Sequence, residues 1–374
     1  MAAALPWIAL GVAAVLVFAP VVERAVYLGV SDFRWHAQTA RDWADGGAPS
    51  TPHFLFHALL VATEPVLPDV DWLRRAVLLA LACQALLAVV VTALVREAIP
   101  LRRGVARFAT AALLALAALL AAPVTFGSWA ERNLYHGYVG LAVYHNPTLF
   151  LLKPLAVLLW WEVSRVLAGA HRPALLLGAL TVASALAKPS HLIALLPATA
   201  GLALVLAWRG RRPGWRTLLL GLALPGVLTL AWQFAFRYGG GVTVAWAPLQ
   251  AMSHRGASLW GRLILSALFP LAMLASFPRA FTRHVGLALA AATFAVGAGY
   301  TYLLAESGDA LAHRNFAWSA QSALFVLFIA GMRTLVLEAR RSAPWKGLRL
   351  FACAAALALH VVCGVYFYVH PTWW

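Results

Sequence analysis

Carboxylate and imidazole side chains recur in this chain at spacings that suit proton transfer. The segment SDFRWHAQTARDWADGG begins at Ser31, and its Asp32 and His36 are four residues apart, so a helix would place them on one face. A partly desolvated carboxylate can act as a general base near neutral pH, and Asp32 is the candidate for that role. Oriented by His36 or Arg34, it would accept a proton from a hydroxyl group. The alternative is a helix cap, because Ser and Asp are both common N-cap residues.

A second polar group follows about 100 residues later, in the segment FGSWAERNLYHGYVGLAVYHNP. Six of its side chains could line a site for a sugar or a lipid headgroup: Glu131, Tyr135, His136, Tyr144, His145 and Asn146. An aromatic belt at a membrane interface would also explain the tyrosines. It does not explain the carboxylate or the two histidines.

Two further segments carry cations that could bind a phosphate. Lys188 interrupts two short apolar runs in ALAKPSHLIALLPA, and a charge at membrane depth usually faces a cavity or a partner. The alternative is that the lysine extends toward the lipid headgroups. His313 and Arg314, in AESGDALAHRNFAW, supply further cationic groups for an anionic phosphate.

Metal binding is left open by the histidines. His53 and His57 are four residues apart, and with Asp32 and His36 they offer nitrogen and oxygen ligands to a divalent ion. No compact signature such as a helical His-Glu-x-x-His is present. We therefore assign no cofactor and keep a divalent metal as an alternative.

The elements that must position these residues are membrane helices. Hydrophobic residues make up 63% of the 374 residues and charged residues only 11%, whereas soluble domains carry about a quarter. A span needs roughly 20 mostly apolar residues. The sequence predicts an all-α polytopic bundle of about eleven spans in one domain, near residues 5–22, 73–97, 104–123, 148–168, 174–187, 190–208, 217–236, 259–277, 285–304, 320–338 and 349–368.

Charge divides the predicted loops into two classes. Seventeen of the 29 Lys and Arg gather in alternate loops, which the positive-inside rule assigns to the cytoplasm, together with the N-terminus. The other loops hold ten of the 13 acids and nine of the 12 histidines. These clusters explain the net charge of +16 without nucleic acid as a partner. The candidate chemistry thus falls on the outer face.

The first outer loop is predicted to run from residue 23 to 72. Its residues 53–67 are apolar, but a span there would reverse the side of every later loop. We therefore expect an interfacial or re-entrant helix. The three cysteines all lie in apolar segments and indicate neither disulfides nor a thiolate metal site.

The order of these pieces resembles the GT-C superfamily of polyprenyl-phosphate-sugar-dependent glycosyltransferases, which includes protein mannosyltransferases and aminoarabinose transferases. Asp32 follows the first span, Arg74 and Arg75 open the second, NPTLFLL at 146–152 is similar to the family's Asp-Pro, and AKPS at 187–190 is similar to its Lys-Gly-Pro turn. The resemblance covers roughly residues 1–208, and residues 209–374 would be variable helices. Phe33 replaces the family's second acid and Asn146 its later Asp.

The resemblance implies sugar transfer from a polyprenyl-phosphate donor to a lipid or glycan acceptor, with inversion and with Asp32 as base. The donor phosphate would be bound by Lys188, Arg314 and His313. The substrate would be contacted by Arg34, His36, His53 and His57, and by the six residues between Glu131 and Asn146 named above. The expected location is the inner membrane of a bacterium, with a periplasmic active site. Alternatives are a polymerase or ligase of undecaprenyl-linked glycans, and a lipid-sugar transporter or flippase.

Overall fold

The chain is a bundle of helices, here described from a computed structural model. The structure describes residues 4–27, 31–101, 104–125, 138–141, 143–239, 243–250, 259–308, 311, 314–340 and 347–370. Within these ranges the only sheet is one antiparallel pair, β1 (Val244–Trp246) and β2 (Leu304–Glu306). The all-α fold class is confirmed.

Helices fall on each of the eleven segments in which a span is expected, and two of these segments are divided into two or three pieces. They are α1 (Leu5–Tyr27), α4 (Trp72–Ala98), α5 (Gly104–Leu120), α6 (Pro147–Leu167), α7 (Ala174–Ala187), α8 (Ser190–Trp208), α9 (Trp215–Leu218) with η1 (Leu219–Ala223) and α10 (Leu224–Tyr238), α11 (Leu259–Ser266) with α12 (Leu268–Ser276), α14 (Val285–Leu303), α15 (Ala317–Ala339) and α16 (Gly347–Val369).

Among the described residues, seven helices are long and apolar enough to cross a membrane. The number is eight if α11 and α12, which meet at a bend of 71°, form one broken span. The helices α5 and α7 are apolar but shorter, with 17 and 14 residues. These helices fit a multi-pass membrane protein, while the number eleven remains a prediction.

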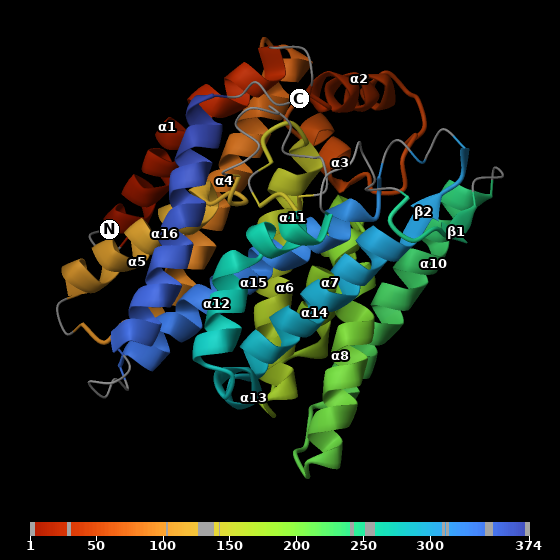
Figure 1. Cartoon of the computed structure of the whole chain (residues 1–374). Coiled ribbons are helices and arrows are strands. Elements are labelled where there is room, and N and C mark those ends of the chain that lie inside the picture. The colour runs from red at the N-terminus through yellow and green to blue at the C-terminus, as the bar shows by residue number, and fades with distance from the viewer. Residues whose placement is uncertain are drawn as a thin grey trace.

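Short helices outside the spans mark the two ends of the bundle. The helices α2 (Phe33–Ala44) and α3 (Leu55–Ala62) lie at one end, which we call the site end (Figure 1). The helix α13 (Ala280–Arg283) and the α8–α9 turn lie at the other, which we call the basic end (Figure 1). With eight residues, α3 is far shorter than a span, in agreement with an interfacial position.

A proline in the α9–η1–α10 helix fixes the position of α7. Pro225 has no backbone N–H to donate to the carbonyl of Gly221, and Thr181 Oγ1 of α7 lies 2.9 Å from this carbonyl. The same hydroxyl lies 2.8 Å from the carbonyl of Leu177, so the two carbonyls share its one proton. Near the site end, Gln233 Nε2 of α10 donates to the carbonyl of Ala185 at 2.9 Å and to that of Pro52 at 3.1 Å. The last turn of α7 and the loop before α3 are thereby held together.

Candidate functional site

Asp32 occupies the N-cap position of α2 but does not cap the helix with its side chain. Its Oδ2 instead accepts a hydrogen bond from Asn146 Nδ2 at 2.6 Å, and its backbone N–H donates to the carbonyl of His145 at 3.0 Å. Asp32 is half-buried, and no described group donates to Oδ1. The capping alternative is therefore wrong, and one carboxylate oxygen is available to a substrate.

Asn146 caps the opposite element, helix α6. Its Oδ1 accepts from the backbone N–H of Leu149 at 3.3 Å, which satisfies one of the free donors at the start of this helix. The same oxygen accepts from Thr148 Oγ1 at 2.7 Å. Because both acceptor contacts fix the amide, its NH₂ group is directed at Asp32.

Lys188 lies where α7 ends and α8 begins, and its side chain is 8% exposed. The ammonium donates to Thr148 Oγ1 at 3.3 Å and lies 4.6 Å from the ring centroid of Trp318 at the start of α15. Burial lowers the pKa of Lys188 to about 8, although attraction to Asp32 opposes this shift. Lys188 is thus mostly a cation at neutral pH, and two of its three N–H donors remain for a ligand.

These contacts form one hydrogen-bond chain with a single direction. Lys188 donates to Thr148, Thr148 donates to Asn146, and Asn146 donates to Asp32. Its members come from the α7–α8 junction, from α6 and from the start of α2, so segments more than 100 residues apart meet at one place. The arrangement fixes a carboxylate and an ammonium near each other without a direct ion pair between them.

The histidines of the first outer loop form a separate pair beside this chain. His36 Nδ1 and His57 Nε2 are 2.8 Å apart, so one ring must donate and the other accept. Burial lowers the pKa of His57 to about 4 and that of His36 well below its ordinary value. The expectation that His36 or Arg34 orients Asp32 is wrong, because Asn146 holds this carboxylate and Arg34 is exposed.

Two other histidines lie near the lysine. Burial and the charge of Lys188 lower the pKa of His53 and of His145 to about 3 in each case. Thr51 Oγ1 is 3.0 Å from His53 Nδ1, and the ring of His145 lies 5.8 Å from that of Trp318. The four imidazoles are therefore neutral at neutral pH, and neutral imidazoles are suited to hydrogen bonding with hydroxyl groups.

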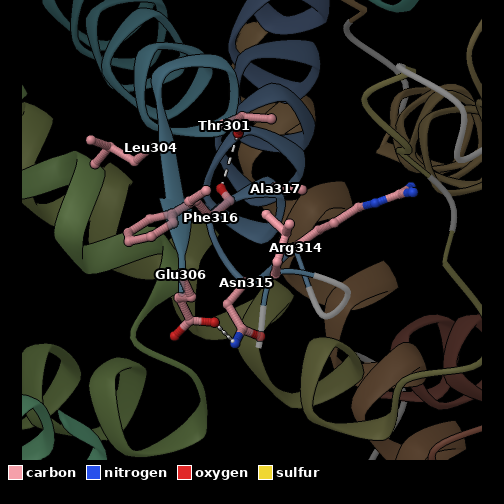
Figure 2. A pocket seen from close by; sticks show the side chains of 9 residues that line it. Thr301, Leu304, Glu306, Arg314, Asn315, Phe316 and Ala317 are labelled. Carbon is pink, nitrogen blue, oxygen red and sulfur yellow. Dashed lines mark hydrogen bonds between the residues drawn. The ribbon is translucent and has the colours of Figure 1, made fainter. Parts of the chain in front are cut away.

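Other predicted site residues lie elsewhere. Tyr144 is 2% exposed and its ring stacks on Phe367 of α16 at 5.8 Å, so this side chain belongs to the core. Arg314 lines a separate pocket with Glu306, which spans about 220 Å³ including its open mouth (Figure 2). Figure 2 shows the Arg314 side chain directed away from Glu306. The predicted residues Glu131, Tyr135, His136 and His313 lie outside the described residues.

Within the described ranges, no group of three or more His, Cys, Asp or Glu side chains could hold a metal ion. His36 and His57 bond to each other, and Asp32 bonds to an amide.

Sequence reasoning missed Thr148 and Trp318, which complete the site. Thr148 comes directly after Asn146 and Pro147, and its side chain is fully buried. Its position in the first turn of a helix that begins with an N-cap residue was its only signal in the sequence. Lys153 was also missed. It is buried one helical turn and a half further along α6, donates to the carbonyl of Leu141 at 2.9 Å and lies 4.8 Å from the ring centroid of Phe325.

Comparison with protein-family models finds no match for this chain, and comparison with curated proteins finds none either. The resemblance to glycosyltransferases therefore consists of the short motifs alone.

Proposed function

We propose that this chain is a membrane glycosyltransferase that moves a sugar from a polyprenyl-phosphate donor to an acceptor hydroxyl at the site end, with Asp32 as general base. One observation carries the proposal: the hydrogen-bond chain that connects Lys188 to Asp32 through Thr148 and Asn146. It brings together the motifs that resemble GT-C glycosyltransferases, although they are far apart in the sequence.

The reaction would begin with a proton moving from the acceptor hydroxyl to Asp32 Oδ1. The acceptor oxygen would then form a bond to the anomeric carbon, while the bond from that carbon to the phosphate oxygen breaks and its electron pair leaves with the polyprenyl phosphate. Inversion at the anomeric carbon follows from a single displacement. Asn146 positions the base in this scheme, because its amide holds Oδ2 and leaves Oδ1 directed elsewhere.

Lys188 would stabilise the negative charge that develops on the leaving phosphate. Electrostatic stabilisation of this kind is usually the largest single contribution to catalysis. A buried ammonium is effective here because the low local dielectric strengthens its attraction for an anion. The charge of one lysine matches that of a phosphodiester, which carries one negative charge.

The test is release of polyprenyl phosphate from a labelled polyprenyl-phosphate sugar by the purified protein in liposomes. Asp32→Asn should abolish release, since the amide cannot accept the proton but is the same size as the carboxylate. Asp45→Asn is the matched control, because this acid lies at the end of the same helix with a side chain that is 71% exposed. Full activity of Asp32→Asn would remove Asp32 from the role.

The same assay separates the alternatives. A transporter or flippase would move the intact donor across the bilayer without releasing phosphate. A polymerase or ligase would release the lipid carrier only when a glycan chain is supplied as acceptor. Release that requires a simple hydroxyl acceptor, with one sugar added to it, supports the proposal.

A further inference from the structure

The turn between α8 and α9 carries a dense group of arginines at the basic end. Both flanking helices, Ser190–Trp208 and Trp215–Tyr238, are candidate spans, so the turn that joins them lies at a membrane surface. Its arginines are all exposed and make no hydrogen bond or ion pair with another described side chain: Arg209, Arg211, Arg212 and Arg216.

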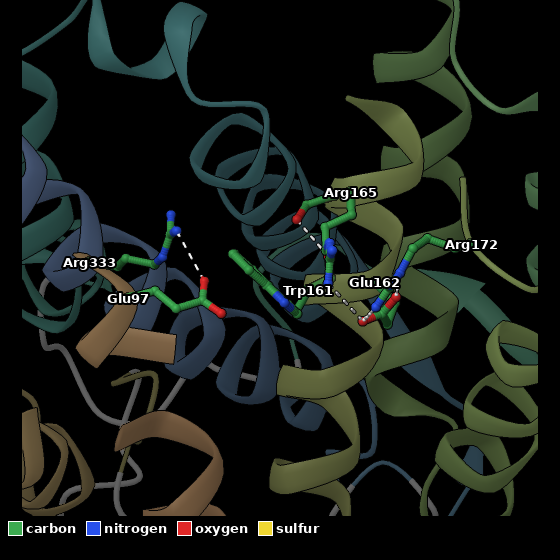
Figure 3. Close-up of polar contacts among 7 residues, drawn as sticks. Glu97, Trp161, Glu162, Arg165, Arg172 and Arg333 are labelled. Atoms are coloured by element: carbon green, nitrogen blue, oxygen red, sulfur yellow. Dashed lines mark hydrogen bonds and ion pairs between the residues drawn. The ribbon is translucent and has the colours of Figure 1, made fainter. Parts of the chain in front are cut away.

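The acidic side chains of three helices at this end already form ion pairs with arginines outside the turn. The helices α4, α6 and α15 each run from the site end to the basic end and carry one acid in their last two turns. Each acid pairs with an arginine: Glu97 with Arg333 at 3.6 Å, Glu162 with Arg172, and Glu338 with Arg283 at 3.9 Å. Figure 3 shows the first two of these pairs. The carboxylates of the described chain therefore leave the turn's positive charge uncompensated.

The backbone of the turn is fixed to the neighbouring helix α6. Gly214 N–H donates to the carbonyl of Val166 at 3.1 Å, and Thr217 Oγ1 donates to the carbonyl of Arg172 at 3.3 Å. A Cβ atom at Gly214 would lie 2.9 Å from Val166 Cγ1, so a larger residue here would displace the Val166 side chain. The arginines thus extend from a rigid support, which lowers the entropy lost when they bind a ligand.

Tryptophans flank three of the four arginines, Arg209, Arg211 and Arg212, in the sequence. Trp208 ends α8 with 87% of its surface exposed, and Trp215 begins α9 with 39% exposed. Tryptophan is enriched at the depth of the lipid headgroups, where its ring is partly in hydrocarbon and its N–H is in contact with water. The guanidinium groups of the turn are therefore expected at the level of lipid phosphates, which they can bind with two parallel hydrogen bonds.

We propose that the α8–α9 turn binds the phosphate headgroup of an anionic phospholipid. The flanking tryptophans and spans favour a lipid over a soluble anion or an acidic protein, because they place the positive charge in the headgroup layer. This inference does not depend on the proposed transferase activity.

Native mass spectrometry of the purified full chain with phosphatidylglycerol or phosphatidylcholine tests the proposal. We expect the chain to retain phosphatidylglycerol preferentially, and the triple variant Arg209→Gln, Arg211→Gln and Arg212→Gln to retain it about a hundredfold less, since each arginine near an anionic lipid surface contributes about fivefold. The single variant Arg211→Gln tests the turn, and Arg279→Gln is its matched control. Arg279 is also exposed at the basic end but lies outside the turn.

The outcomes separate the possible ligands. Loss in Arg211→Gln with little change in Arg279→Gln supports the site, and a triple lysine variant should keep most of the binding because it keeps the charge. Equal retention of the two lipids, equal loss in both single variants, or unchanged retention in the triple glutamine variant would overturn it. Equal binding of glycerol phosphate, which has no acyl chains, would show a soluble-anion site instead. Size-exclusion profiles and melting temperatures verify that each variant is folded.

Discussion

The pKa of Lys188 gives a direct test of the proposed role of this residue. Burial lowers this pKa to about 8, so about nine-tenths of the side chain is charged at pH 7 and about one-tenth at pH 9. If the ammonium stabilises the leaving phosphate, kcat/KM for transfer should fall about tenfold between these two pH values. A phosphodiester donor does not titrate in this range, so the decrease would report the free protein.

The assay is the pH profile of kcat/KM for wild type and two variants. Lys188→Arg should lose the alkaline decrease, because guanidinium stays charged to far higher pH, although its different shape will lower the maximal rate. Lys188→Met removes the charge at every pH and should have low activity with no alkaline dependence. An alkaline decrease of the same size in Lys188→Arg would assign it to another group and refute the reasoning.

A second variant tests the electrostatic link between the two ends of the hydrogen-bond chain. Asp32 attracts the ammonium and so raises the pKa of Lys188 against the effect of burial. In Asp32→Asn this attraction is lost, and Lys188 should lose its proton at lower pH. Because the variant is expected to be inactive, the measurement is the pH midpoint of donor binding, which should move downward relative to wild type.

Two buried hydroxyl groups and two histidines allow further tests. Thr148→Val removes the hydroxyl that links the ammonium to the amide, so transfer should fall at least about tenfold while Thr148→Ser keeps most of it, as a single-turnover assay would measure. Thr181→Val removes the hydroxyl that α7 directs at the Gly221 carbonyl and should lower the free energy of unfolding by roughly 1 kcal/mol, seen as a lower melting temperature with unchanged transfer per folded molecule. His53 and His57, with pKa values of about 3 and about 4, stay neutral above pH 5, so the rate profile should have no inflection from them between pH 5 and 7.

Much of the bundle could be predicted from composition and charge, since burial of backbone polar groups in lipid permits few folds other than helices. The expected boundaries of α7 and α8 agree with the structure to the residue, because Lys188 and Pro189 cannot continue an apolar helix between them. The bend of 71° between α11 and α12 has a signal in Pro270, which has no N–H for the Ser266 carbonyl four residues earlier. This signal does not locate the break by itself, because the helices α1, α6 and α8 each contain a proline and stay continuous.

The candidate site was predictable only in part, because residue type indicates chemistry but not partners. Asp32 and Lys188 stood out since charges are rare in such a chain. The pairing of His36 with His57 could not be foreseen, because a spacing of four residues joined His36 to Asp32 equally well on a helix. Thr148 gave almost no signal, since hydroxyl groups are common in membrane helices and most bond to their own backbone.

Asn146 shows why a departure from a familiar motif can be consistent with the same chemistry. An Asp at this position would face Asp32 across the 2.6 Å that separates the two side chains, and two carboxylates so close must share a proton or a cation. The described residues provide no group of three ligands for a metal there. An amide is uncharged and donates a hydrogen bond, so it stabilises the ionised form of its neighbour. The asparagine and the lysine are therefore both consistent with the proposed reaction, in which the amide would orient the base and the buried ammonium would supply positive charge.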